Sequence, residues 1–310
     1  MMEEMKRAEW RKAIPEKRDR VQSRVLGWGI GVVLAVLSVD TVRRAIPLGG
    51  RFPVFVFGVF AVSAMFAGLV LALRAATLGG AVCGGMICLL VTFWSGGLTE
   101  AIGRSALTPL ALLFVFTFVA TRAGRQRKTK AGLAEAKRGR SAAQVIANLS
   151  AAALCASPVM AWALRHGEGD FVAGIPGWAG WMMKTMCLAA LVEATADTVS
   201  SEIGQAFGGQ PVMVTNLRRV APGTDGAVTV LGSGAGVVGG AMVAGAGAWA
   251  MHLEGRAALV ALGAGVCGLF FDSLGGATLE CRGWLGNDLV NFTSTVFAAG
   301  LAGALYCWLF

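Results

Sequence analysis

Residues 53–73 read PVFVFGVFAVSAMFAGLVLAL, a run of 21 residues without a charged side chain. A helix needs roughly 20 apolar residues to cross the hydrocarbon core of a bilayer. The run is therefore long enough to span a membrane as one helix. Similar apolar runs recur along the 310-residue chain, so the sequence predicts an all-α, polytopic integral membrane protein.

The composition supports this class. Hydrophobic residues make up 55% of the chain and charged residues only 15%, with a mean hydropathy of +0.65, far from the balance of soluble domains. The 44 glycines would let membrane helices approach closely. The seven cysteines form no CxxC pair and lie mostly in or beside apolar runs. We therefore interpret them as small buried apolar residues rather than disulfides or a zinc site.

We expect about nine transmembrane helices. They correspond to residues 25–42, 53–73, 76–94, 106–121, 143–164, 174–192, 228–250, 257–271 and 289–309. The chain then divides into a basic N-terminal segment (1–24), a first group of transmembrane helices (25–121), a basic linker (122–140) and a transmembrane core whose loops carry the polar motifs (141–310).

Basic residues predict the orientation of these helices. With the N-terminus inside, the cytoplasmic segments hold 20 Lys and Arg residues and the opposite side holds six. Because cytoplasmic loops carry an excess of Lys and Arg, we expect the N-terminus inside and the C-terminus outside. Topology and contact with anionic lipid headgroups then account for the net charge of +9, so membrane lipids are expected partners and nucleic acid is not.

Acidic residues gather on the same side. Two loops, 193–227 and 272–288, hold seven carboxylates against three arginines. The seven are Glu193, Asp197, Glu202, Asp225, Asp272, Glu280 and Asp288. A charge at the centre of a membrane helix costs about 2.5–3.5 kcal/mol on insertion scales, so the cluster needs a compensating partner. A hard divalent cation with oxygen ligands would be one; the alternative is an ordinary helix cap and a solvated loop.

Regular spacing places the first of these groups on one helix face. Glu193, Asp197 and Ser201 follow one another at intervals of four residues and so share a face, whereas Glu202 points elsewhere. Two carboxylates one turn apart can hold Mg²⁺ or a metal-bridged phosphate.

The later polar segments repeat this spacing. Asp272, Gly276 and Glu280 also recur every four residues, and the glycine leaves room for a ligand between the two acids. In NDLVN (287–291) the two asparagines share a face. Asp288 beside them either contributes to a ligand site or caps the helix.

Residues 215–229, TNLRRVAPGTDGAVT, form a loop because of their Pro-Gly and Asp-Gly pairs. Arg218 and Arg219 can pair with phosphate oxygens. Just before the next span, the backbone N–H groups of Gly223, Thr224 and Gly226 are left accessible. Such an arrangement favours the binding of anions. The chain has no GxxxxGK[ST] phosphate loop, so a plain turn with two arginines that set topology is the alternative.

A polar stripe marks the start of the fifth expected span. Arg140, Gln144 and Asn148 follow one another at intervals of four residues. Side chains in such a stripe either contact a lipid headgroup or form hydrogen bonds to another helix.

Five motifs carry a resemblance to a known family. ADTVSSEIG (196–204), RRVAPGTDGAVT (218–229), FDSLGGATLE (271–280) and WLGNDLVNF (284–292) resemble the integral-membrane family that contains plant phytyl-phosphate kinase and human transmembrane protein 19. GRSAAQVIAN (139–148) resembles the upstream motif of that family. The resemblance covers the chain from roughly residue 75 onwards and is distantly shared with CTP-dependent polyprenol kinases and CDP-lipid synthases.

The resemblance implies a reaction and its participants. A phosphoryl group would pass from a nucleoside triphosphate, with CTP as the expected donor, to an isoprenoid monophosphate, and Mg²⁺ would be required. The motif residues that carry over are Asp197, Glu202, Arg218, Arg219, Asp272, Glu280, Asn287, Asp288 and Asn291. The chain departs from the family pattern at Asp225-Gly226-Ala227, where Asn-Gly-Gly is expected, and at Val199-Ser200, where Trp-Ala is expected.

These features predict a prenyl-phosphate kinase in the membrane, the inner membrane in a bacterium, with its active site facing the cytoplasm. We expect Asp197, with Asp272 or Asp288, to hold Mg²⁺, and Arg218 and Arg219 to stabilise the transferring group. The glycine-rich seventh and eighth spans would leave a groove for the prenyl tail. Further substrate and nucleotide contacts are expected from Glu193, Ser201, Glu202, Gly223, Thr224, Gly226, Glu280, Asn287, Asn291, Arg140, Gln144 and Asn148.

Two other functions stay open. A CTP-dependent polyprenol kinase or a lipid cytidylyltransferase would differ only in its product. A lipid-phosphate or cation transporter would also carry acids and glycine-broken helices within the membrane. A transporter needs polar access from both sides, however, and the expected outer side has few clustered polar groups.

Overall fold

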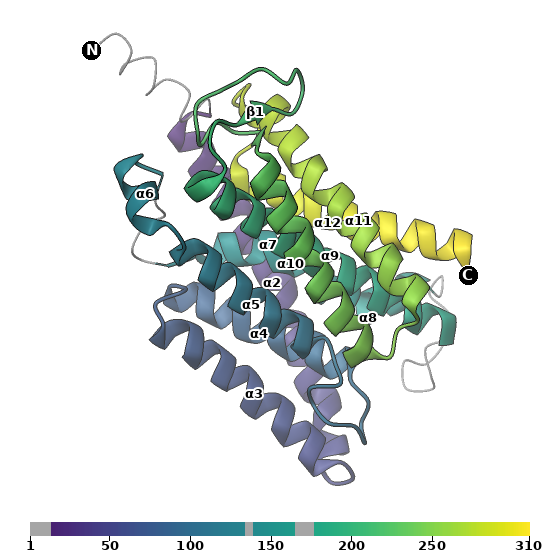
Figure 1. Cartoon of the computed structure of the whole chain (residues 1–310). Coiled ribbons are helices and arrows are strands. Elements are labelled where there is room, and N and C mark those ends of the chain that lie inside the picture. The colour runs from purple at the N-terminus through teal and green to yellow at the C-terminus, as the bar shows by residue number, and fades with distance from the viewer. Residues whose placement is uncertain (1–13, 134–138, 165–176) are drawn as a thin grey trace.

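The computed structural model describes residues 14–133, 139–164 and 177–310. Within them the chain is almost wholly helical (Figure 1), which confirms the all-α prediction. The helices are α2 (Glu16–Gly49), α3 (Pro53–Ala72), α4 (Leu78–Ser95), α5 (Leu107–Arg122), α6 (Arg125–Lys130), α7 (Ala142–Cys155), α8 (Pro158–Leu164), α9 (Gly177–Phe207), α10 (Val230–Met251), α11 (Gly255–Gly275), the π-helical turn η1 (Gly276–Glu280) and α12 (Asn287–Leu309).

One short hairpin interrupts the helices. Strands β1 (Val212–Met213) and β2 (Ala227–Val228) are antiparallel, with Val212 opposite Val228 and Met213 opposite Ala227. The hairpin and α6 lie at the same end of the helix bundle, the upper end in Figure 1.

Within the described residues, the predicted spans coincide with helices; residues 174–176 of the span expected at 174–192 lie outside the described residues. Among the described residues, six helices are long and apolar enough to cross a membrane: α2, α3, α4, α10, α11 with η1, and α12. Helices α5 and α7 are apolar but shorter, and α7, with 14 residues, extends only about 21 Å. The span expected at 143–164 is divided between α7 and α8, which starts at Pro158. The total of nine spans and their orientation stay predictions.

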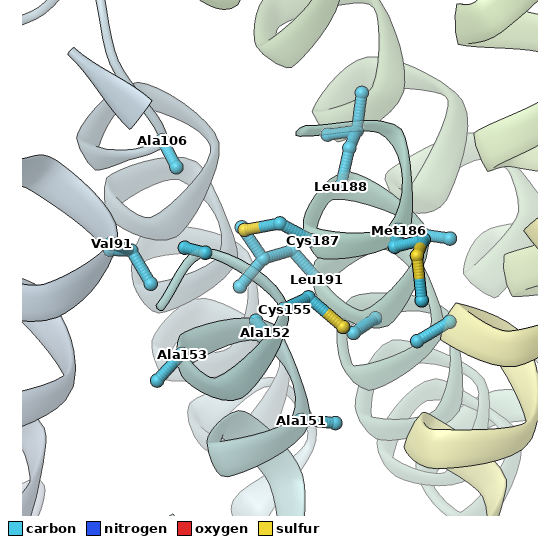
Figure 2. Packing of buried hydrophobic residues seen from close by; sticks show 14 of the residues in the cluster. Val91, Ala106, Ala151, Ala152, Ala153, Cys155, Met186, Cys187, Leu188 and Leu191 are labelled. Carbon is cyan, nitrogen blue, oxygen red and sulfur yellow. The ribbon is translucent and has the colours of Figure 1, made fainter. Parts of the chain in front are cut away.

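Helix α9 forms the centre of the bundle and packs against α5, α7, α10, α11 and α12. Its residues Cys187 to Val192 are fully buried. Figure 2 shows Cys187 and Leu191 of α9 beside Cys155 of α7. Close packing depends on small residues: a Cβ atom at Gly232 of α10 would lie 2.5 Å from the Ser200 carbonyl oxygen of α9.

The cysteines are all free, as predicted, but they differ in exposure. Four are buried, namely Cys83, Cys88, Cys155 and Cys187. The remaining three, Cys267, Cys281 and Cys307, are exposed on the isolated chain.

From Glu16 onwards, the basic N-terminal segment belongs to α2. Arg18 Nη1 donates to the Gly283 carbonyl oxygen at 2.9 Å, and Gln22 Nε2 donates to the Trp284 carbonyl oxygen at 2.8 Å. The Gly286 N–H donates back to Gln22 Oε1 at 2.8 Å. The start of α2 therefore holds the loop that leads into α12.

Candidate functional site

A polar cavity of about 290 Å³ lies where the C-terminal half of α9, the β1–β2 segment, α11 with η1 and the start of α12 meet. Thirteen of the predicted site residues line it: Arg140, Gln144, Asn148, Asp197, Ser201, Glu202, Gly223, Thr224, Gly226, Asp272, Glu280, Asn287 and Asn291. Motifs as far apart in the sequence as Arg140 and Asn291 thus meet at one end of an apolar bundle.

Two carboxylates are central to the cavity. Asp197 comes from α9 and Asp272 from α11. Asp272 Oδ2 accepts a hydrogen bond from Ser294 Oγ at 3.1 Å. In the amide orientation that satisfies both of its ends, Asn291 also donates to Asp272 Oδ2, at 3.2 Å. Two side chains of α12 therefore hold Asp272 in place. The prediction that Asp272 acts together with Asp197 did not include this contact with α12.

Arg140 supplies the positive charge that faces Asp197. Its Nη2 donates to Thr198 Oγ1 at 3.4 Å. Its backbone is anchored, because the Arg140 N–H donates to the Ala75 carbonyl oxygen and its own carbonyl oxygen accepts from the Thr77 N–H, both at 2.9 Å. The polar stripe that begins at Arg140 therefore faces the cavity.

The rest of that stripe lines the cavity and forms hydrogen bonds within α7 and its N-terminal cap. Gln144 lines the cavity, yet its Oε1 accepts from the Ser141 N–H at 2.8 Å in a capping box that begins α7. Asn148 Nδ2 donates to the Gln144 carbonyl oxygen at 2.8 Å. The S-x-x-Q pattern at 141–144 is a sequence signal for this helix start that the stripe alone does not convey.

Buried carboxylate oxygens without a partner mark the base of the site. Glu193 is 1% exposed and lies in the core behind the cavity, where a Cβ atom at Gly268 would come within 2.6 Å of its Cγ. Its Oε1 and the Oε1 of Glu280 are buried and make no hydrogen bond. Because an unpartnered buried oxygen is costly, these two atoms indicate that the site is completed by a proton or a cation.

Glu202 has a partner that the sequence did not reveal. It lines the edge of the cavity and forms a salt bridge with Lys128 of α6. Lys128 is 2% exposed, and its Nζ also donates to the Thr121 carbonyl oxygen at 2.8 Å. The basic linker therefore includes a buried lysine that holds α6 against α9.

The loop before β2 packs against η1, backbone to backbone. Gly226 has a φ of +75°, and a Cβ atom at Gly276 would lie 2.6 Å from the Gly226 nitrogen. Burial raises the pKa of the Asp225 carboxyl in this loop to about 6, and the nearby Asp19 carboxylate adds to the shift. The π-helical turn offsets Glu280 from a regular four-residue spacing, yet Asp272, Gly276 and Glu280 all reach the cavity.

Three other predicted residues lie outside the cavity lining. Arg218 and Arg219 are exposed in the segment between β1 and β2, where the Arg218 N–H donates to Asn216 Oδ1 at 3.0 Å. Asp288 lies in the first turn of α12 and faces α2, next to Ser23 and Asp19. Its position at the positive end of the helix dipole is favourable for a carboxylate. A role of these residues in catalysis stays a prediction.

Thr229 also belongs to the site, although its sequence motif did not predict this role. Its side chain accepts from the Gly232 N–H at 3.0 Å, caps α10 and lines the cavity. A threonine directly before an apolar run is a recognisable helix start. Ser294 has no such signal, because its contact with Asp272 depends on how α11 and α12 pack.

The cavity fits a magnesium ion only together with a ligand. Among the described residues, no three His, Cys, Asp or Glu side chains form a group that could hold a metal by themselves. Magnesium is usually held by one or two carboxylates with water and substrate phosphates. Asp197 and Asp272, beside buried oxygens that lack partners, match that smaller set of ligands.

Comparisons with known proteins agree with the resemblance in the motifs. The model of the family described as "Integral membrane protein DUF92" matches residues 61–299. An uncharacterized membrane protein of Methanocaldococcus jannaschii is 36% identical over 124 residues, which cover 39% of this chain and 51% of that protein. The chain thus spans about half the length of that relative.

Two further relatives align over longer stretches. An uncharacterized membrane protein of Synechocystis sp. is 30% identical over 224 residues, covering 69% of this chain and 81% of that protein. Protein VTE6, chloroplastic, of Arabidopsis thaliana is 27% identical over 208 residues, covering 66% of this chain and 59% of that protein. No solved structure matches the chain.

Proposed function

The chain belongs to the integral membrane protein family DUF92, and we propose that it is a prenyl-phosphate kinase. It transfers a phosphoryl group from a nucleoside triphosphate to an isoprenoid monophosphate and so forms the diphosphate. CTP is the proposed donor. The motifs support this, since they resemble the family of plant phytyl-phosphate kinase. The observation that carries the proposal is that Asp197, Asp272 and Arg140 line one polar cavity at the end of an apolar helix bundle.

Asp197 and Asp272 are the residues that hold Mg²⁺ in this proposal. When bound, the ion neutralises charge on the donor phosphates. The two carboxylates come from facing helices, and Ser294 and Asn291 fix the position of Asp272. Preorganised ligands of this kind supply most of what phosphoryl transfer requires, because the reaction depends mainly on positioning and electrostatics.

The remaining residues of the cavity orient the two substrates. Arg140 binds the acceptor phosphate, and the loop from Gly223 to Gly226 offers backbone N–H groups to the donor. An acceptor phosphate oxygen forms the new bond to the γ-phosphorus while the bond from that phosphorus to the bridging oxygen breaks, and the nucleoside diphosphate leaves. The acceptor oxygen is already anionic, so no general base is needed, and no histidine of the described residues lines the cavity.

The cavity faces the cytoplasm in this proposal, because its loops lie on the side with the excess of Lys and Arg. Nucleoside triphosphates are supplied on that side, while the acceptor reaches the site from the surrounding membrane.

An assay with purified protein tests the proposal. The protein in detergent receives Mg²⁺, CTP or ATP, and a panel of prenyl alcohols and monophosphates, and lipid products are identified by mass spectrometry. We expect a prenyl diphosphate, and a loss of turnover of at least about 100-fold in Asp197→Asn and Asp272→Asn. Asp40→Asn is the matched control, since Asp40 pairs with Arg44 on α2 and does not line the cavity.

The product decides among the related reactions. A CDP-lipid would indicate a cytidylyltransferase, and a prenyl monophosphate formed from the alcohol would indicate a polyprenol kinase. No nucleotide-dependent product with any acceptor, or full activity in both cavity variants, would refute the enzyme proposal.

A further inference from the structure

A second cavity, of about 130 Å³, lies between α3, α4, α5 and α7. Its inner part is apolar and includes Phe66, Leu110 and Phe114. Phe66 and Phe114 meet edge to face, with ring centroids 5.6 Å apart. Arg140 and Asn148 line this cavity as well as the acidic one, so the two spaces adjoin at these side chains.

The mouth of the apolar cavity is basic. Arg74, Arg122 and Arg125 line it together with Arg140. The Arg122 guanidinium lies 3.4 Å from the centroid of the Phe118 ring, and its Nη2 donates to the Leu73 carbonyl oxygen at 3.2 Å. Within the described part of the chain, no hydrogen bond or ion pair occupies the Arg74 or Arg125 guanidinium. These two exposed groups are available to an anion.

The backbone around the mouth is held in an unusual conformation. Arg74 has a φ of +52°, a left-handed value that is uncommon for a residue other than glycine. Gly139, with a φ of +74°, packs against it so closely that a Cβ atom there would lie 2.7 Å from the Arg74 carbonyl oxygen. The bridge between Ala76 and Arg140 completes this contact. Strained backbone of this kind tends to occur at ligand sites.

Helix packing fills part of the groove that was expected at the seventh and eighth spans. The glycines of α10 that face α9 are used for helix packing: a Cβ atom at Gly232 would lie 2.5 Å from a backbone oxygen, and one at Gly240 would lie 3.1 Å from Val192 Cγ1. In contrast, the nearest side-chain atom to a Cβ at Gly84 of α4 is Phe66 Cε1, at 3.6 Å. Gly84 also lines the second cavity, so that space lies beside α4.

We propose that the α3–α4–α5–α7 cavity holds the apolar chain of a single-chain isoprenoid monophosphate, with its phosphate at the mouth formed by Arg74, Arg125 and Arg140. This assignment rests on the proposed kinase function and locates its acceptor. Charge complementarity supports it, since a phosphate suits guanidinium groups and an isoprenoid chain suits the apolar interior. Arg140 then places the acceptor phosphate at the boundary of the acidic cavity, where Asp197 and Asp272 lie.

Nucleotide-free photolabelling tests the assignment directly. The wild-type protein in detergent is irradiated with farnesyl monophosphate that carries a diazirine at the end of its chain, and labelled peptides are mapped by mass spectrometry. We expect labels on α3 and α5 around Phe66 and Phe114. Labels confined to α10 and α11 would overturn the assignment, and this result does not depend on the folding of any variant.

Competition and matched variants refine the test. Unlabelled farnesyl monophosphate should compete at least about ten-fold better than farnesol, inorganic phosphate or dioleoyl phosphatidic acid; equal competition by phosphatidic acid would overturn the single-chain assignment. Gly84→Leu should reduce labelling at least about ten-fold, while Gly68→Leu, on a face of α3 with no atom within 4 Å, should not. Unchanged labelling of Gly84→Leu would contradict the proposal.

Two arginines of the short helix α6 test whether a positive charge at the mouth of the cavity binds the phosphate. Arg125→Gln should weaken competition by farnesyl monophosphate about ten-fold and leave that by farnesol unchanged. Arg127→Gln is the control, since Arg127 stacks over Phe207 and does not line the cavity. Labelling at α3 and α5 without any kinase product would refute the proposed reaction and retain the lipid site, so the two failures can be told apart.

Discussion

Replacing Lys128 by methionine tests the interaction that holds α6 against α9. Lys128 is 2% exposed and its partner Glu202 is 7% exposed, so the substitution leaves a carboxylate buried without a counter-charge. Breaking a buried pair from one side costs about 3–5 kcal/mol. At roughly 2 °C per kcal/mol for a chain of this size, we expect Tm to fall by about 6–10 °C.

The double variant separates charge from packing. In Lys128→Met with Glu202→Gln no charge remains buried, so most of the lost stability should return. Recovery should stop short of the wild type, because Lys128 Nζ also donates to the Ala120 and Thr121 carbonyl oxygens at the end of α5. Lys130→Met is the matched control, since Lys130 is exposed on the same helix.

Buried thiols provide the assay. Cys83, Cys88, Cys155 and Cys187 are free and buried, so a thiol-reactive dye reports their exposure as the protein in detergent is heated. A Tm of Lys128→Met within 2 °C of that of Lys130→Met would refute the buried ion pair. Failure of the double variant to recover would show that packing, rather than charge, accounts for the loss.

Three further predictions address the cavity and the helix packing. Gly232→Ala should destabilise the protein by about 1–3 kcal/mol in the same thermal assay. Gly234→Ala should be neutral, because a Cβ atom at Gly234 would have no other atom within 4 Å. Equal effects of the two substitutions would contradict the close α9–α10 contact. The pKa of Asp225 is raised to about 6, so the folded state binds the proton of this carboxyl more tightly than the unfolded state does. The free energy of unfolding should therefore fall by roughly 1–3 kcal/mol as pH rises from 4 to 6, and it should stay low above pH 6. Asp225→Asn should remove that slope in pH-dependent melts, and an unchanged slope would argue against it. Arg140→Gln should lower kinase turnover at least about ten-fold more than Arg218→Gln, because Arg218 is exposed and lies outside the cavity lining; the reverse order in the lipid-product assay would assign phosphate binding to the β1–β2 segment.

The helices could be predicted because the signal is local. An uncharged run such as residues 53–73 is sufficient to form an apolar helix, and α3 covers nearly the same residues. The break at 156–157 was not predicted, although Pro158 is a helix-start residue. A long apolar stretch dominates the pattern and conceals where one helix ends and the next begins.

The cavity could be predicted where a motif lies on a regular helix. Asp197 and Asp272 reach the same space because each lies within a helix directly after its apolar stretch, and the two stretches end on the same side of the bundle. The position of Arg218 outside the cavity could not be predicted, because the course of a short hairpin cannot be read from its residues. Lys128 is in a stretch that has the composition of a solvated linker, and its burial depends on Glu202, which lies 74 residues away. Asp288 faces α2, whose contact with the loop before α12 has no sequence signature.

In the proposed mechanism, Asp197 of α9 and Asp272 of α11 hold one divalent cation together with the donor nucleotide. Electron paramagnetic resonance can measure it, with Mn²⁺ titrated into the purified protein in the presence of CTP. We expect one bound Mn²⁺ per chain, a loss of affinity of at least about ten-fold in Asp197→Asn and in Asp272→Asn, and no change in Asp40→Asn. Equal Mn²⁺ binding by the wild type and all three variants would contradict it.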